Sequence, residues 1–277
     1  PKELASLKKL KRIYWRNNDF NSKMKLPRLE GIEKLDISGN KLKKLPKVHR
    51  LKGVEELVLE NNNFTKVPTW RGRRLKSLKE LDLSKNPVVL NRRWYWLLKD
   101  IEILRLNKCG IEDLHHSLYK MSGLKELLIQ VNELEGIPYG ISGLENLTKL
   151  SFYKNDLKTL PSDLFDLQQL QVIDLYYNSL EKIPADIGKL DSLSILYLSF
   201  NSLYDIPKEI GELSALEELY IHHNRISELP ISLGNLDQLK VFHFQHNYVP
   251  SFPQQVLEME NLEDLDISDT DITEIQA

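Results

Sequence analysis

The chain of 277 residues is poor in the features that mark several protein classes. Its single cysteine, Cys109, excludes a disulfide bond within the chain. The net charge is only −2, so no excess of one sign favours nucleic acid or an acidic membrane. No apolar run approaches the roughly 18 residues of a spanning helix. The chain opens at Pro1 without an initiator Met, so the lack of a targeting segment leaves the compartment open.

Catalytic motifs are also missing. There is no G-x-x-x-x-G-K or G-x-G-x-x-G phosphate loop, no H-E-x-x-H, no nucleophile elbow and no paired cysteine motif. Ser199, His222 and Asp174 offer the residue types of a hydrolase triad, but a chain this rich in Ser and Asp supplies such a set by chance. The sequence therefore predicts a protein that is not an enzyme and has no cofactor.

What the sequence does have is an internal repeat of the form L-x-x-L-x-L-x-x-N-x-L. Five units from Leu147 to Tyr248 follow one another every 23 residues. We predict one domain, 1–277, of about twelve repeats. Their strands start near residues 10, 32, 54, 78, 101, 124, 147, 170, 193, 216, 239 and 262. The last unit stops after its strand and turn, which favours a fragment of a longer protein over a complete one.

Each unit reads as a strand followed by a turn. Alternation turns the fourth and sixth positions, such as Leu196 and Leu198, inward and leaves Tyr197 and Ser199 outside. The Asn at the ninth position can satisfy backbone groups where the chain leaves the strand. Ten units carry it, and Cys109 and Thr270 replace it in the fifth and twelfth. We therefore interpret Cys109 as a small buried member of an asparagine ladder and not as a redox residue.

The second half of each later unit begins at a proline. Pro184 is followed by Ile187 and Leu190 at near-helical spacing, so these segments are predicted to be short helices or 3₁₀ turns with both apolar residues inward. Five glycines in this half are expected to serve tight backbone turns. They are Gly140, Gly143, Gly188, Gly211 and Gly234.

With this repeat the chain resembles the leucine-rich-repeat family, in the 23-residue class shared by intracellular Ras-group and bacterial members. Segments such as IPADIGKLDS (183–192) carry the resemblance. It implies an α/β fold: a right-handed solenoid with a concave parallel sheet and short helical or irregular convex segments. Regular repeats without cysteine caps resemble bacterial members, which favours a bacterial cell surface or periplasm over the cytoplasm.

Aromatic and histidine side chains gather at the outward positions of the later units. Because neighbouring strands lie about 4.8 Å apart, equivalent positions form columns of touching side chains. Tyr provides contact area and a polar tip, and exposed aromatic patches mark interaction sites. We predict that ten residues bind the partner, although the rings could instead only stack to stabilise the sheet. They are Tyr153, Tyr176, Tyr177, Tyr197, Phe200, Tyr220, His222, His223, His243 and His246.

The four histidines also raise the question of a metal site. Asp266 and Asp269 follow them in the same columns, and His with carboxylate suits zinc. Three strands span about 9.6 Å, however, which is wide for a tetrahedral site. We predict no metal. The same histidines could instead make binding pH-sensitive, because free His titrates near pH 6.5.

A second, basic-aromatic group occurs in the irregular third and fourth units. It could bind a partner, an acidic lipid head group or nucleic acid. We favour the simpler interpretation, in which the Trp side chains fill core space and the Arg side chains are solvated. The group comprises Arg71, Arg73, Arg74, Arg92, Arg93, Trp70, Trp94, Tyr95 and Trp96.

The sequence as a whole predicts a non-catalytic module that binds a protein or peptide on the concave face of the sixth to twelfth units. Two alternatives stay open. One is carbohydrate binding on the Tyr and His residues, and the other is a structural or adhesive role as a spacer. No nucleic acid is expected as a partner, and no segment is expected to span a membrane. The oligomeric state stays open.

Overall fold

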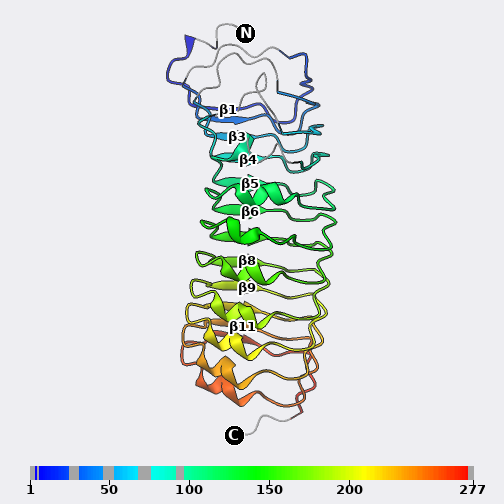
Figure 1. Ribbon diagram of the computed structural model, residues 1–277, viewed down its shortest axis with the longest axis vertical. Coiled ribbons are helices and arrows are strands. Elements are labelled where there is room, and N and C mark those ends of the chain that lie inside the picture. The colour runs from blue at the N-terminus through cyan, green and yellow to red at the C-terminus, as the bar shows by residue number, and fades with distance from the viewer. Residues whose placement is uncertain are drawn as a thin grey trace.

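The computed structural model describes residues 4, 6–24, 31–45, 53–67, 76–91 and 97–273. Its described strands form a single parallel sheet in chain order, stacked from the N-terminal to the C-terminal end (Figure 1). The strands are β1 (Arg12–Tyr14), β2 (Lys34–Asp36), β3 (Glu56–Val58), β4 (Glu80–Asp82), β5 (Ile103–Arg105), β6 (Glu126–Leu128), β7 (Lys149–Ser151), β8 (Val172–Asp174), β9 (Ile195–Tyr197), β10 (Glu218–Tyr220), β11 (Val241–His243) and β12 (Asp264–Asp266).

Each strand is short and begins two residues after the predicted start of its repeat, at the third position. The middle residue of the strand faces the core: Leu196 on β9 pairs with Ile173 on β8 and with Leu219 on β10. Leu196 and Leu198 are each 1% exposed, which confirms the predicted alternation. The unbroken register keeps every outward position directly above the same position of the next repeat.

The second halves of the later repeats form 3₁₀ helices, as predicted. In Figure 1 they lie in front of the sheet. In the unit of η5, Ile187 and Leu190 are both buried, and the Leu190 N–H closes the helix on the Ile187 carbonyl. The helices are η2 (His116–Lys120), η3 (Ile141–Gly143), η4 (Ser162–Asp166), η5 (Ala185–Lys189), η6 (Lys208–Glu212), η7 (Ile231–Asn235) and η8 (Gln254–Glu258).

The apolar core runs between the sheet and these helices along the whole stack. Phe152, Phe165, Phe242 and Phe244 are its largest fully buried members besides Phe64. Because each repeat packs on its two neighbours, stability is close to a sum of repeat and interface contributions.

The asparagine ladder forms as predicted. In Asn201, the side-chain amide donates to the carbonyls of Leu198 (2.9 Å) and Leu175 (3.0 Å), and its oxygen accepts the Leu180 N–H (3.0 Å). One amide thus joins two successive repeats. The same bond to the sixth-position carbonyl of the preceding repeat is made by Asn40, Asn62, Asn86, Asn132, Asn155, Asn178, Asn224 and Asn247.

Cys109 occupies the ladder position of the fifth unit, again as predicted. Its thiol lies 3.4 Å from the Leu83 carbonyl, the acceptor that an Asn would use, and 3.5 Å from the Asn107 carbonyl. Burial raises the pKa of the thiol to about 11. Thr270 keeps a single bond, from its hydroxyl to the Ile267 carbonyl at 3.0 Å.

The glycines of the convex half have a different role from the one expected. Gly140 alone among the five has a positive φ, of 107°. At Gly211 an added Cβ would lie 2.1 Å from the Ser232 carbonyl oxygen of the next repeat, and at Gly143 it would lie 2.4 Å from the Tyr119 carbonyl oxygen. These glycines permit close approach of neighbouring repeats, and the turn conformation is needed at Gly140 only.

The basic-aromatic group of the third and fourth units lies outside the described residues.

Candidate partner-binding face

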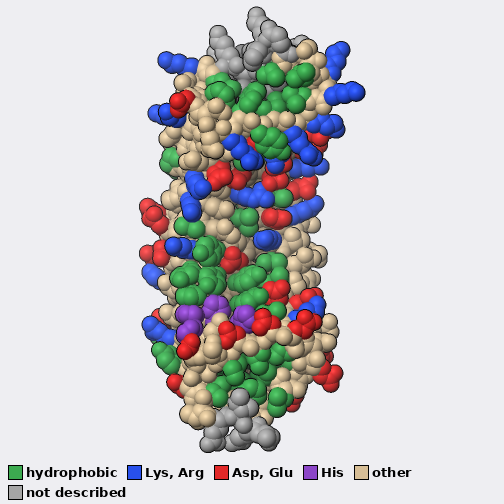
Figure 2. All heavy atoms as spheres, turned by 180° about the vertical axis from the view of Figure 1, so that it is seen from behind, with side chains coloured by type: hydrophobic (Ala, Val, Ile, Leu, Met, Phe, Trp, Pro, Cys, Tyr) green, Lys and Arg blue, Asp and Glu red, His purple; other side chains and the backbone are tan. Residues whose placement is uncertain are grey.

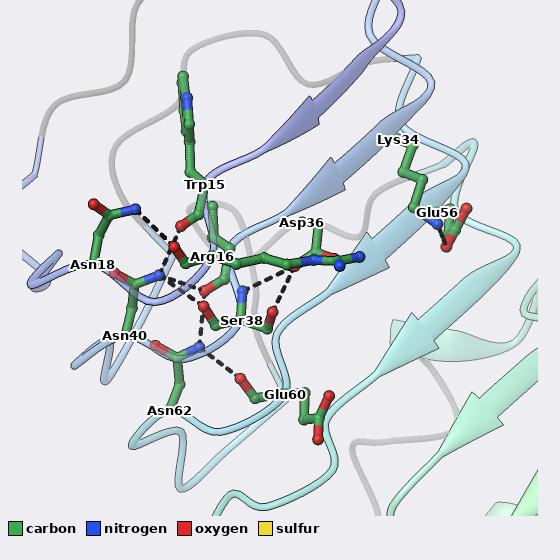
Figure 3. Close-up of polar contacts among 11 residues, drawn as sticks. Trp15, Arg16, Asn18, Lys34, Asp36, Ser38, Asn40, Glu56, Glu60 and Asn62 are labelled. Carbon is green, nitrogen blue, oxygen red and sulfur yellow. Dashed lines mark hydrogen bonds and ion pairs between the residues drawn. The ribbon is translucent and has the colours of Figure 1, made fainter.

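The outward side of the sheet, called the sheet face below, differs between its two halves. Over β1–β6 its charged side chains pair across neighbouring strands. Arg16 donates to Asp36 at 2.6 Å (Figure 3), and Lys85 lies 2.8 Å from Glu60. Two further ion pairs join Lys34 to Glu56 and Arg105 to Glu80. The polar groups of this half are therefore largely satisfied within the protein.

Over β7–β11 the ten predicted residues lie on one part of the sheet face, which we call the belt, and form two sets of ring contacts. The smaller set contains Tyr197, Tyr220 and His243, and the larger set contains the other seven residues. Figure 2 shows this part of the sheet face as a patch of hydrophobic side chains followed by histidines and then by acidic groups. Tyr177 is 43% exposed. Most of the other members are half-buried, because each ring covers part of the next.

The eighth positions form the longest run of stacked rings. Tyr177 and Phe200 stack with centroids 4.3 Å apart and planes 18° apart. Phe200 and His223 stack at 4.0 Å and 12°, and His223 meets His246 at 4.0 Å with a tilt of 46°. The centroid distances are close to the strand spacing of about 4.8 Å, so the rings stand one behind another along the sheet.

The fifth and seventh positions form two further runs beside it. At the fifth position Tyr197 stacks on Tyr220 at 4.9 Å and 14°, and Tyr220 meets His243 edge-on at 5.1 Å. At the seventh position Tyr153 stacks on Tyr176 at 5.7 Å and 26°. Between these two runs lies a shallow furrow of about 400 Å³. It is lined by Tyr153, Asp174, Tyr176, Tyr197, Tyr220, His222 and His243.

Two rings of the seventh position close over Ser199. Tyr176 and His222 belong to β8 and β10 units, two strands or about 9.6 Å apart, yet their centroids are 5.8 Å apart. They lean together above Ser199, which is 0% exposed and whose hydroxyl has no hydrogen-bond partner. Ser199 is thus not bonded to His222, and the two do not form the start of a hydrolase triad.

The furrow contains a carboxylate with a distinct environment. Asp174 accepts a hydrogen bond from the Ser151 hydroxyl (2.7 Å) and another from the Tyr176 N–H (3.2 Å). Desolvation nevertheless raises the pKa of Asp174 above its ordinary value.

Acidic side chains are the main charged groups on this half of the sheet face. From β8 to β12 the third, fifth, seventh and eighth positions carry no Lys or Arg and five carboxylates, those of Asp174, Glu218, Asp264, Asp266 and Asp269.

The surroundings of His222 and His223 lower the pKa of both side chains. Burial, followed by repulsion from His223 and His243, lowers the pKa of His222 to about 4. The Nδ1 atoms of His222 and His223 are 2.9 Å apart, a hydrogen bond whose direction depends on the tautomers. His246 Nε2 lies 3.3 Å from the Asp269 carboxylate.

Geometry for a metal ion is not found in the part of the chain that the structure describes. No group of three His, Cys, Asp or Glu residues there is arranged to hold one. His243 Nε2 lies 3.1 Å from Asp264, without the angles of a hydrogen bond. The histidine end of the belt is therefore better described as a row of imidazole rings facing carboxylates.

One feature of this face was not anticipated. The eighth-position residue of every unit has left-handed backbone, with φ between 51° and 63°. Asn17, Gly39 and Asn61 tolerate this conformation well. Their occurrence at the eighth position was the feature of the sequence that could have indicated left-handed backbone there. Val131 with φ 55° is an outlier for a β-branched residue. Tyr177, Phe200, His223 and His246 adopt it too, so the stacked run of the belt is displayed from strained backbone.

Within the described ranges, no helix combines the length and the hydrophobicity needed to cross a bilayer. No curated protein is significantly similar to the chain in sequence. A family model described as "Leucine rich repeat" matches residues 145–203 and 191–249, the regular half of the chain that carries the belt.

Solved structures are similar over nearly the whole chain. A leucine-rich-repeat protein of Leptospira interrogans is 31% identical with a TM-score of 0.88, and the match covers 98% of this chain and 69% of that one. An internalin of Listeria monocytogenes is 18% identical, with a TM-score of 0.77 and coverage of 99% and 84%. The ectodomain of an Arabidopsis thaliana receptor kinase, in complex with a CASPARIAN STRIP INTEGRITY FACTOR, is 26% identical, with a TM-score of 0.73 and coverage of 98% and 37%.

Proposed function

Because the chain belongs to the leucine-rich-repeat family, we propose that it is a non-catalytic module that binds a protein or peptide on its sheet face. The binding surface lies on the sixth to twelfth units, and the belt forms its centre. The observation that carries this proposal is the contrast between the two halves of the face: the first carries internal Lys and Arg ion pairs, and the second carries rings that stack on one another.

The physical properties of the belt support this role. Tyr side chains offer large contact area with a polar tip and lose little conformational entropy when they are bound. Here the neighbours already hold the rings in place, since Tyr197 stacks on Tyr220 and Tyr177 on Phe200. A partner would therefore meet a preorganised surface, which lowers the entropic cost of association. The Arabidopsis ectodomain, solved in complex with its factor, shows that the same fold accommodates such a partner.

The stacking favours a protein or peptide over a carbohydrate. A sugar ring packs best on an open aromatic face, whereas most faces in the belt are covered by the next ring along the sheet. What the belt presents outward is ring edges, Tyr hydroxyls and His ring nitrogens. These groups suit the mixed apolar and hydrogen-bonding contacts of a polypeptide.

The test is a selection of displayed random peptides on the immobilised protein, followed by affinity measurement for the selected peptides. The belt variant carries Tyr177→Ser, Tyr197→Ser and Tyr220→Ser. These side chains lie on the outward positions, so the variant keeps the core and should fold with an unchanged far-UV circular dichroism spectrum. We expect the selected peptides to lose at least about tenfold in affinity, the effect of removing a hot-spot residue.

A matched control replaces the same number of exposed tyrosines outside the belt. Tyr139, Tyr204 and Tyr248 are 77%, 46% and 59% exposed, and Tyr139→Ser, Tyr204→Ser and Tyr248→Ser should leave the affinity unchanged. Peptides that bind the belt variant as well as the original protein would show that the belt is not the binding surface. A glycan array probed with both variants addresses the carbohydrate alternative in the same way.

A further inference from the structure

The N-terminal end of the sheet face contains a small cation site that the protein fills with its own side chain. Tyr14 on β1 and Asp36 on β2 are paired neighbours at the fifth position. The guanidinium carbon of Arg16 lies 5.1 Å from the centre of the Tyr14 ring, and its Nε donates to Asp36 at 2.6 Å. Figure 3 shows Arg16 reaching across to Asp36, which is 1% exposed. A tyrosine and an aspartate on adjacent strands thus hold one guanidinium.

The same pair of residue types recurs inside the furrow of the belt. Asp174 on β8 and Tyr197 on β9 are again paired neighbours at the fifth position. The order along the sheet is reversed, since Asp174 precedes Tyr197 whereas Tyr14 precedes Asp36. The seventh positions of these two repeats hold Tyr176 and Ser199, where the first site has Arg16 and Ser38. Tyr153 of the preceding repeat also lines the furrow. No Lys or Arg among the described residues forms an ion pair with Asp174, and Lys149 acts on it only through a longer-range attraction.

One ring face of Tyr197 is turned toward this carboxylate. Nearly parallel rings 4.9 Å apart stack face to face, so Tyr220 covers the side of Tyr197 that points to β10. The other side points to β8, where Asp174 stands in place of a ring. Negative charge on Asp174 is among the causes that raise the pKa of Tyr197, after burial and Glu218, which is consistent with this proximity.

We propose that the furrow between Asp174 and Tyr197 binds an arginine side chain of the partner. The guanidinium would lie against the open face of Tyr197 and donate to the Asp174 carboxylate, as Arg16 does with Tyr14 and Asp36. This inference rests on the proposed function and specifies the kind of segment that the belt recognises. Arginine fits better than lysine because its planar group can stack and donate from one edge at once.

The charge of the surrounding surface agrees with a basic partner. The five carboxylates on the outward positions of β8 to β12 face no Lys or Arg of their own strands. His222 and His223 add little positive charge to offset them, since burial lowers the pKa of both side chains. A basic segment would be drawn to this half by an attraction that weakens with salt, whereas the first half is balanced by its own ion pairs.

The experiment uses the peptides selected on the full chain and measures their affinity by calorimetry. Selected sequences should be enriched in arginine. Replacing that arginine with citrulline keeps the shape and removes the charge, and we expect about tenfold or more weaker binding. With the Asp174→Asn variant, the arginine and citrulline peptides should bind alike. The Asn oxygen can still accept from the Tyr176 N–H, and its NH2 group can donate to the Ser151 hydroxyl, so this variant should fold. The control is Asp191→Asn, an exposed carboxylate outside the sheet face, which should preserve the difference.

The outcomes separate this inference from the proposed function. If peptides need the three belt tyrosines but bind equally with arginine or citrulline, the arginine site is refuted and the binding face stands. If the arginine effect persists in Asp174→Asn, the cation is bound elsewhere, and the site is again refuted. Peptides that ignore the belt tyrosines, or a selection that yields no binder, count against both.

Discussion

The asparagine ladder gives a prediction whose size follows from counted contacts. Asn224 is 7% exposed. Its amide donates to the carbonyls of Ile221 (2.8 Å) and Leu198 (3.1 Å), and its oxygen accepts the Leu203 N–H (3.0 Å). Asn224→Ala removes these three hydrogen bonds. The Leu203 N–H is left without a partner, whereas the carbonyls of Leu198 and Ile221 keep their bonds from Asn201 and Asn247. At about 1 kcal/mol for each lost hydrogen bond, the free energy of unfolding should fall by about 3 kcal/mol.

The measurement is urea unfolding followed by far-UV circular dichroism, with the slope of the transition used to check that the same surface is exposed. Thr270→Ala is the internal comparison, because Thr270 sits at the equivalent position and makes one bond only. Its expected cost is about 0.5–1 kcal/mol. If Asn224→Ala were no more destabilising than Thr270→Ala, the backbone groups that Asn224 bonds would be forming hydrogen bonds to water instead. The asparagine ladder would then not be a source of stability.

Two further predictions concern titration and reactivity. The pKa of His222 is about 4 in the folded chain and ordinary, near 6.5, in the unfolded chain, so between these values only the unfolded chain takes up the proton. The free energy of unfolding should therefore fall as the pH is lowered from 6.5 to 4, and His222→Gln should flatten that slope in unfolding titrations. Cys109, with its pKa raised to about 11, should react with a thiol-specific reagent at pH 8 about a hundredfold more slowly than in the urea-unfolded chain. Equal rates would show that the ladder opens locally.

Most of the fold follows from the periodicity of the sequence. The buried Leu196 and Leu198, the helix containing Ile187 and the ladder position of Cys109 were all predictable, because each depends on contacts that recur in every repeat. The role of Gly211 was not. A glycine that permits close approach and a glycine that permits a turn look the same in one sequence, and the distance to Ser232 of the next repeat decides between them.

The candidate site was predictable as a set of residues but not as an arrangement. Column positions place Tyr197 beside Tyr220 and Tyr177 beside Phe200, since the register is fixed by the repeat. Column positions do not tell which ring faces are covered, or that Tyr176 lies over Ser199 in contact with His222. They also do not tell that Arg16 and Asp36 form an ion pair with each other. Those features depend on side-chain rotamers, which one sequence without its coordinates does not specify.

The left-handed backbone at the eighth position has a consequence for how this surface can change. In the first units the position is held by Asn17, Gly39 and Asn61, residue types that accept the conformation at little cost. In the belt it is held by Tyr177 and Phe200 among others, and these two residue types adopt the conformation less readily. Replacing the eighth-position residues of the belt with Asn or Gly, as in the first units, would relieve this backbone strain and raise thermal stability. The same replacements would remove the longest run of stacked rings. The sequence of this half therefore keeps an exposed ring surface at the expense of thermal stability.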